Sequence, residues 1–181
     1  MAKTVLVPIA DGSEEIEAVT IIDVLRRAGA EVVAASVENQ QITASRGVKI
    51  SADTLIKDCT GRRFDLIALP GGMPGAENLS KCDELIAMLK EQKKSGRLYA
   101  AICASPAVVF QRHGLIDDVK ATCYPSMLED LAHGVNSPVV VDSNCITSQG
   151  PGTATLFALK LVELLFDSEK RDEVARAMLV Q

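Results

Sequence analysis

Short runs of hydrophobic residues alternate along the chain with longer segments in which hydrophobic residues recur every three or four positions. The short runs are rich in Val, Ile, Leu and Ala, which is typical of parallel strands buried on both faces. We expect strands at residues 3–8, 31–37, 64–69, 97–102, 139–141 and 145–148. The longer segments predict helices at residues 14–28, 83–94, 105–112 and 153–166, and a terminal helix at 168–180.

This alternation of strand and helix predicts an α/β fold: a doubly wound, mainly parallel sheet sandwiched by helices, with right-handed crossovers. Residues 41–51 alternate more strictly between apolar and polar positions and predict a small antiparallel excursion. Gly29 and Gly96 directly follow helical segments, where a left-handed cap residue is favoured. No linker, low-complexity segment or internal repeat interrupts residues 1–181, so we expect one domain.

The composition excludes several classes of protein. An apolar share of 48% rules out a disordered chain, and 19 basic against 24 acidic residues, with 3% aromatics, argue against nucleic-acid binding. No run approaches the ~18 apolar residues that a membrane helix needs. The first apolar stretch is interrupted by Pro8 and Asp11, too early for a signal peptide. We therefore expect a cytoplasmic protein that binds neither nucleic acid nor membrane.

The cysteine and histidine pattern argues against a metal site. The five cysteines form no C-x-x-C motif, and their odd number favours reduced thiols over a zinc site or a disulfide framework. His113 and His133 each precede a glycine, as surface turn residues do, so a Ser-His-Asp triad lacks its usual components. Neither of the two glycine-rich nucleotide-binding motifs, G-x-G-x-x-G and G-x-x-x-x-G-K-S/T, occurs in the sequence.

In open α/β sheets, ligands bind outside the carboxyl ends of the strands. The loops in which we expect chemistry are those that follow Pro8, Leu69, Ile102 and Ser148.

Cys103 is the candidate nucleophile. Residues 97–106 read RLYAAICASP, a strand that ends at Cys103 and turns at once into a helix with Pro106 in its first turn. This is the pattern of a nucleophile elbow. Free N–H groups and the positive end of the helix dipole would lower the pKa of the thiol below its usual value of about 8.5. The alternative is a small buried hydrophobic side chain, which describes most free cysteines.

Two glycine-containing loops lie at the same edge. Residues 69–75 read LPGGMPG, and two adjacent glycines let backbone N–H groups approach an oxyanion. Residues 149–153 read QGPGT, in which Gly150 and Pro151 are candidates for shaping a pocket. In both loops the alternative is a tight turn without a ligand.

Residues 11–18, DGSEEIEA, open the first helix. Asp11 or Ser13 would cap it, because both side chains can accept a hydrogen bond from a free helix N–H group. Glu17 stands beside an apolar stretch, so its carboxylate would point over the sheet edge and act as an acid or base. A solvated helix face is the alternative.

Six segments, in order, span nearly the whole chain and carry a specific resemblance. They are GSEEIEAV at 12–19, LRRAGAEV at 25–32, SRGV at 45–48, LPGGMPGAENL at 69–79, AAICASPA at 100–107 and TSQGPGTA at 147–154. Together they resemble the ThiJ/PfpI superfamily and, within it, the clade of the Parkinson-associated protein DJ-one and its bacterial relatives. The resemblance implies a flavodoxin-like sandwich, a homodimer, and no metal or organic cofactor.

The resemblance also implies roles for individual residues. Cys103 matches the family's oxidation-sensitive nucleophile, and Glu17 matches the acid that contacts its sulfur and serves as acid and base. Gly72 and Ala104 match the positions whose backbone N–H groups form the oxyanion pocket. Because protease-like members carry His directly after the nucleophile, Ala104 also argues against proteolysis.

Three further pocket positions follow from the resemblance. Arg46 and Arg27 match basic residues near the pocket, and Arg27 would arrive from the partner subunit of the homodimer. Tyr124 stands where some relatives carry a histidine implicated in catalysis. Tyrosine can donate a hydrogen bond but is a poor base near neutral pH.

The resemblance implies a cysteine-dependent, cofactor-free glyoxalase or protein deglycase that acts on 2-oxoaldehydes such as methylglyoxal and glyoxal, or on glycated protein side chains. The alternative is a redox-sensing chaperone of the oxidative-stress response, in which Cys103 is oxidised and Arg46 and Arg27 stabilise the resulting anion. A structural or thiamine-linked role is suggested only by the ThiJ name, and no residue pattern supports a thiazole or phosphate site.

Overall fold

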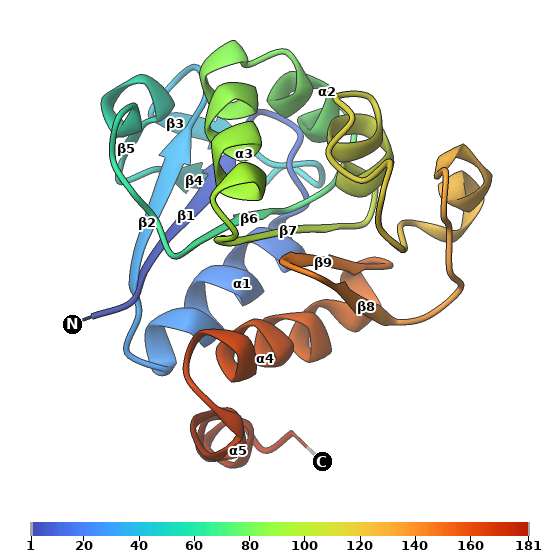
Figure 1. The fold of residues 1–181 in the computed structure, drawn as a ribbon. Coiled ribbons are helices and arrows are strands. Elements are labelled where there is room, and N and C mark those ends of the chain that lie inside the picture. The colour runs from blue at the N-terminus through green and yellow to red at the C-terminus, as the bar shows by residue number, and fades with distance from the viewer. Residues whose placement is uncertain (1, 181) are drawn as a thin grey trace.

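The computed structural model describes residues 2–180, and its centre is a seven-stranded sheet in the order β5-β2-β1-β6-β7-β9-β8 (Figure 1). The strands are β1 (Thr4–Ile9), β2 (Glu31–Ser36), β5 (Thr54–Leu55), β6 (Leu66–Leu69), β7 (Leu98–Ile102), β8 (Val139–Asp142) and β9 (Cys145–Ser148). All neighbouring strands pair in parallel except β8, which runs antiparallel to β9. The mainly parallel α/β sheet predicted from the sequence is confirmed.

Helices cover both faces of this sheet (Figure 1). The helices on one face are α1 (Glu15–Arg27) and α4 (Ala154–Leu165), with α5 (Ser168–Ala177) packed outside α4. Those on the other face are α2 (Gly75–Ser80), α3 (Asp83–Lys94) and the π-helix η2 (Pro106–Gln111). None of the helices within residues 2–180 is long and apolar enough to span a bilayer.

Each central strand contributes side chains to two hydrophobic cores, because successive side chains of a strand point to opposite faces of the sheet. Val5 and Val7 of β1 belong to the core beneath α1 and α4, whereas Leu6 belongs to the core beneath α3. All three side chains are fully buried. Burial on both sides explains the near-continuous apolar runs of the sequence.

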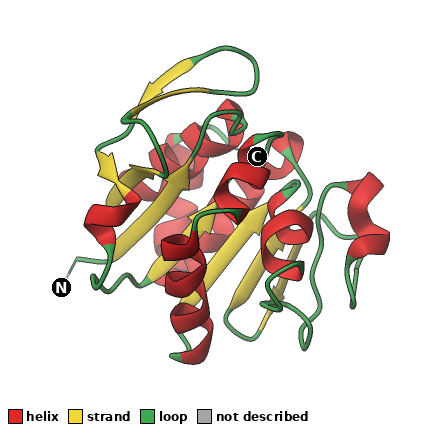
Figure 2. Cartoon of the chain, turned by 90° about the horizontal axis from the view of Figure 1, so that it is seen from above, coloured by secondary structure: helices red, strands yellow, loops and turns green. Residues whose placement is uncertain are grey.

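The antiparallel excursion is the hairpin of β3 (Gln41–Thr43) and β4 (Lys49–Ser51). Seen from above, it stands apart from the main sheet (Figure 2). Backbone hydrogen bonds from Gly12 N–H to Thr43 O (2.9 Å) and from Ser45 N–H to Ser13 O (2.9 Å) tie it to the loop after β1. The hairpin thereby brings its turn to the carboxyl edge of the sheet.

The start of α1 differs from the prediction. The N-cap residue is Glu14, and it makes no side-chain cap hydrogen bond. Asp11 instead accepts a hydrogen bond from Thr43 N–H (2.7 Å), and Ser13 Oγ accepts one from Ala10 N–H (3.0 Å). Capping by Asp11 or Ser13 is therefore wrong, because both side chains satisfy N–H groups of the neighbouring loops.

The cap glycines are confirmed. Gly29 follows α1 with φ 90°, and Gly96 follows α3 with φ 72°, both in the left-handed region. Glycine adopts this region without the steric penalty that a Cβ atom imposes.

Candidate active site

Five segments meet at the carboxyl edge of the sheet, and backbone hydrogen bonds join them in a group of two and a group of three. Glu14 N–H, before α1, donates to Gly71 O after β6 (2.9 Å). Cys103 N–H, after β7, donates to Ser148 O at the end of β9 (3.0 Å), and Tyr124 N–H donates to Cys103 O (2.8 Å). The edge that the fold rule indicates is thus assembled around Cys103.

Cys103 occupies a constrained backbone position between β7 and η2. Its φ of 64° lies in the left-handed region, which residues with a side chain rarely adopt. Gly71 packs directly against it: a Cβ atom on Gly71 would lie 2.6 Å from Cys103 Cβ and 2.8 Å from Ile102 O. The sharp strand-to-helix turn predicted from the sequence is present, and it holds the thiol at one place.

Glu17 is the buried neighbour of this thiol. Its side chain is fully buried on α1, and its Oε2 atom accepts a hydrogen bond from Gly71 N–H (2.7 Å). Its Oε1 atom is buried without a well-formed hydrogen bond to any of residues 2–180. The Cys103 thiol is the polar group beside this carboxyl group. The alternative interpretation, that Glu17 lies on a solvated helix face, is wrong because α1 directs this side chain into the protein.

Burial shifts the pKa values of both groups upward. It raises the pKa of Glu17 to about 7. Burial, followed by the charge of Glu17, raises the pKa of Cys103 to about 12, although N–H groups of Gly72 and Ala104 directed at the sulfur lower it. The expectation of a lowered thiol pKa is therefore wrong: the two N–H groups do not outweigh burial and a neighbouring carboxylate.

Glu17 and Cys103 therefore form a coupled pair that holds one proton between the two titration steps, and the higher pKa of Cys103 places that proton on the sulfur unless it is transferred to Glu17. When the proton is on Glu17, the negative charge is on the sulfur and faces the N–H groups of Gly72 and Ala104. Such a pair combines a nucleophile with an acid that becomes a base after it gives up its proton.

A cavity of about 440 Å³ opens onto Cys103, within the size range of small-molecule sites. Of the residues proposed from the sequence, those that line it are Cys103, Gly72, Ala104, Arg46, Tyr124 and Pro151. Gly150 lies behind the Tyr124 ring, since a Cβ atom on Gly150 would be 3.5 Å from Tyr124 Cδ2. The structure thus brings these residues together over the buried Glu17.

The turn that carries Arg46 is held by acidic residues whose part in the site the sequence did not reveal. Glu15 accepts hydrogen bonds from Arg46 N–H (3.0 Å) and from Ser45 Oγ (2.9 Å), and Ser45 Oγ also lies 2.7 Å from Glu14. Glu14 and Ser45 line the cavity themselves. The sequence feature that could have indicated Glu14 and Glu15 is the Glu-Glu pair before Ile16, but acidic residues are equally typical of an ordinary helix start.

The model of the DJ-1/PfpI family matches residues 3–164. The chain belongs to the DJ-1/PfpI family. It is 50% identical to the Arabidopsis thaliana "Protein DJ-1 homolog A" over 184 residues, which cover 99% of this chain and 47% of that protein. The chain thus spans about half the length of this family member.

Two other family members are similar along nearly their whole length. The Caenorhabditis elegans "Glutathione-independent glyoxalase DJR-1.2" is 37% identical over 178 residues, covering 96% of this chain and 94% of that protein. The solved structure of "Toxoplasma gondii DJ-1, oxidized" has a TM-score of 0.97 and 50% identity, covering 98% of both chains. These similarities confirm the resemblance to the DJ-1 branch of the family.

Arg27 does not reach the cavity of its own chain. It is half-exposed near the end of α1 and forms an ion pair with Asp23 (2.6 Å). Its contribution from a partner subunit of a DJ-1/PfpI homodimer stays a prediction. His113 bonds to Ser80 away from the cavity, and residues 2–180 hold no cluster of three or more residues suited to a metal ion.

Proposed function

We propose that this protein is a glutathione-independent glyoxalase that converts 2-oxoaldehydes such as methylglyoxal into 2-hydroxy acids. The observation that carries the proposal is the Glu17–Cys103 pair, a buried carboxyl group beside a thiol at the floor of a small cavity. A family member that shares 37% of its residues with this chain is itself named a glutathione-independent glyoxalase.

In the first step, the Glu17 carboxylate takes the proton of the Cys103 thiol as the sulfur adds to the aldehyde carbon, and Glu17 then gives this proton to the resulting alkoxide. The product is a hemithioacetal, and Glu17 is now a carboxylate. The N–H groups of Gly72 and Ala104 are the donors proposed to stabilise the oxyanion. Arg46 and Tyr124 stand at the cavity wall, where they would contact the substrate.

In the second step, Glu17 removes the hydrogen from the former aldehyde carbon and returns a proton to the neighbouring carbonyl carbon, while the hydroxyl proton passes from the former aldehyde oxygen to the neighbouring oxygen. The adduct becomes a thioester of the 2-hydroxy acid, which water hydrolyses to release the acid and the free thiol. The sum adds one water to the substrate and needs no oxidant, reductant or glutathione. We propose glyoxal adducts of protein amines as the second substrate class. There the thiol would add to the remaining carbonyl group, and the side-chain amine would then leave with a proton from Glu17, which restores a carbonyl carbon on which the second step proceeds.

The test follows lactate formation from methylglyoxal by purified protein without glutathione. We expect Cys103→Ser to abolish turnover and Glu17→Gln to lower kcat by about 100-fold or more, because Glu17 is the proposed acid and base. Cys82→Ser is the matched thiol control, since Cys82 is partly exposed and lies outside the cavity. Stoichiometric substrate loss without lactate, or equal kcat in Glu17→Gln, contradicts the proposal.

Redox sensing by Cys103 is a second candidate function, with its own supporting observation. Cys59, Cys123 and Cys145 are buried, whereas Cys103 is partly exposed at the cavity floor. The similar structure named "Toxoplasma gondii DJ-1, oxidized" is that of an oxidized family member. The proposed oxidant is peroxide, two equivalents of which would take the accessible Cys103 sulfur to sulfenic and then sulfinic acid after Glu17 has accepted the thiol proton.

Mass spectrometry after mild peroxide treatment tests this function. We expect two oxygen atoms on Cys103 before any of the other four thiols is modified. Modification of the partly exposed Cys82 at the same rate would show that exposure alone decides the reaction and would exclude a sensor role.

A further inference from the structure

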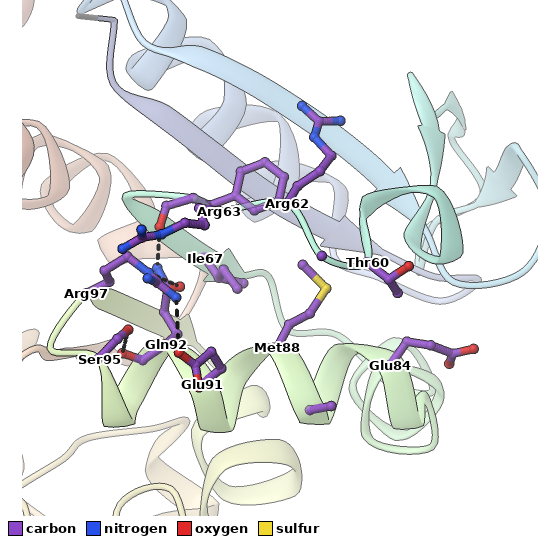
Figure 3. Close-up of a pocket in the computed structure, with 13 residues that line it drawn as sticks. Thr60, Arg62, Arg63, Ile67, Glu84, Met88, Glu91, Gln92, Ser95 and Arg97 are labelled. Carbon is purple, nitrogen blue, oxygen red and sulfur yellow. Dashed lines mark hydrogen bonds and ion pairs between the residues drawn. The ribbon is translucent and has the colours of Figure 1, made fainter.

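A second and larger cavity lies at the opposite edge of the sheet, where β6 and β7 begin. Its volume is about 690 Å³, against about 440 Å³ for the cavity at Cys103. The loop at residues 60–64 forms one wall and α3 forms the other (Figure 3). None of the residues discussed for catalysis lines it.

The floor of this cavity is apolar. Phe64 and Ile67 form its base and are 2% and 1% exposed, so the apolar surface that a ligand can reach comes mainly from Met88, which is partly exposed and extends from α3 into the cavity (Figure 3). A floor of this kind binds the hydrophobic body of a ligand through the apolar area that both remove from water.

One end of the cavity is cationic and preorganised. Arg97 donates from Nε to Gln92 Oε1 (3.0 Å), and Gln92 is only 2% exposed. Gln92 is in turn fixed by hydrogen bonds from Nε2 to Phe64 O (2.9 Å) and Leu98 O (3.0 Å). The closest carboxylate contact of Arg97 is a loose one, from its terminal nitrogen to Glu91 at 3.9 Å. The guanidinium group is thus held in place with capacity left for an acceptor.

Arg63 adds to this charge, whereas the Arg62 side chain points away from Arg97 (Figure 3). Within the part of the chain that the structure describes, neither Arg62 nor Arg63 has a carboxylate oxygen within 4.0 Å. Arg62 lies over the Phe64 ring, 5.2 Å from its centroid. The acidic Glu84 stands at the other end of the cavity from Arg97 (Figure 3).

An adjoining hollow extends the basic end. It shares Arg63, Phe64 and Arg97 with the large cavity and adds Lys3 and Asp65. Asp65 accepts hydrogen bonds from the N–H group and hydroxyl of Thr4 (2.8 and 3.2 Å), so its charge is already partly satisfied. The combined surface pairs an apolar floor with an excess of cationic groups at one end.

We propose that this cavity is a second binding site, for a small organic anion with an aromatic or aliphatic body and a carboxylate head. The body packs mainly on Met88, above Phe64 and Ile67, and the carboxylate pairs with Arg97 and Arg63. The five residues of β7 separate Arg97 from Cys103, a distance of about 20 Å along the strand. A ligand here therefore binds without contacting the Cys103 thiol.

Isothermal titration calorimetry with 2-naphthoate as the probe tests the site. We expect saturable 1:1 binding, with 2-naphthamide, its uncharged counterpart, about tenfold weaker or more because it lacks the charge-assisted hydrogen bonds. Arg97→Gln and Arg63→Gln each weaken 2-naphthoate binding by about tenfold. Arg97→Gln also removes the hydrogen bond to Gln92 and could weaken binding by disturbing the cavity wall. Arg63→Gln separates the two effects, because removal of the Arg63 charge breaks no ion pair of residues 2–180.

Two controls locate the ligand. Arg176→Gln, at an exposed arginine of α5, removes one positive charge far from the cavity and leaves the affinity unchanged. Cys103→Ser binds 2-naphthoate as the wild type does. The proposal is overturned by absence of saturable binding in the millimolar range, by equal affinity for 2-naphthamide, by wild-type affinity in both arginine variants, or by loss of binding in Cys103→Ser.

Discussion

The carboxyl group of Glu17 is fully buried, and one of its oxygens has no well-formed hydrogen bond within residues 2–180. A carboxylate in such a place loses its hydration and regains only the hydrogen bond from Gly71 N–H. Burial therefore raises the pKa of Glu17 from its ordinary value of 4.5 to about 7. The same shift suits the group for proton transfer near neutral pH and makes the folded state sensitive to pH.

The sign of this sensitivity follows from proton binding. Between pH 4.5 and about 7 the folded protein holds the Glu17 proton and the unfolded chain does not, so stability falls as the pH rises through this window. Glu17→Gln is neutral throughout. We expect the variant to gain about 3 kcal/mol relative to wild type between pH 4.5 and pH 8.

Urea denaturation at a series of pH values measures this difference. Glu38→Gln, which removes an exposed carboxylate, is the control and follows the wild-type pH profile. Parallel profiles for Glu17→Gln and wild type would show that Glu17 has the same pKa in the folded and unfolded states.

Local sequence was sufficient to predict the turn at Cys103 but not its titration. The run RLYAAICASP predicts a strand that turns into a helix, and the structure has this turn with φ 64° at Cys103. The direction of the pKa shift depends on a carboxyl group from α1 and on burial by several loops. Both are consequences of tertiary packing, which a ten-residue pattern does not contain.

At the scale of elements, the buried parallel strands were the most predictable. The expected strands at 31–37 and 97–102 correspond to Glu31–Ser36 and Leu98–Ile102, because strands covered on both faces read as continuous apolar runs. The helix Gly75–Ser80 was not expected, since six residues are too short to show a helical period. The two-residue strand Thr54–Leu55 was missed for the same reason.

The segment after Cys103 shows a different limit of sequence patterns. A helix was expected at 105–112, and the structure has the π-helix Pro106–Gln111. Its residues from Pro106 to Phe110 are all buried, so no polar face reveals the number of residues per turn. π-Helical turns are rare in proteins, and those that occur are often found at functional sites. The position of η2 beside Cys103 agrees with this tendency.

At the scale of the whole molecule, the outer face of α1 is unusually apolar. Ile16 and Val19 are 55% and 51% exposed, and Val48 of the neighbouring hairpin turn is 51% exposed. Contiguous exposed apolar side chains of this kind favour an interface. The homodimer expected from the family resemblance would bury them if two copies of α1 packed around a twofold axis.

Antiparallel packing of the two α1 helices would also explain the position of Arg27. The helix has 13 residues and is therefore about 20 Å long, so the end of one copy would lie near the start of the other. The partner subunit's Arg27 would then approach the cavity, which begins at Glu14. In this arrangement each site is completed by the other chain.

Val19→Lys tests the interface, because it places a charge at the centre of the apolar face. We expect wild type to sediment as a dimer at micromolar concentration and Val19→Lys to sediment as a monomer with lower glyoxalase activity. Val141→Lys, at a 43% exposed valine of β8, is the matched control and remains dimeric and active. A monomeric wild type, or a Val19→Lys variant that remains a fully active dimer, would show that α1 does not form the interface and that Arg27 has no part in the site.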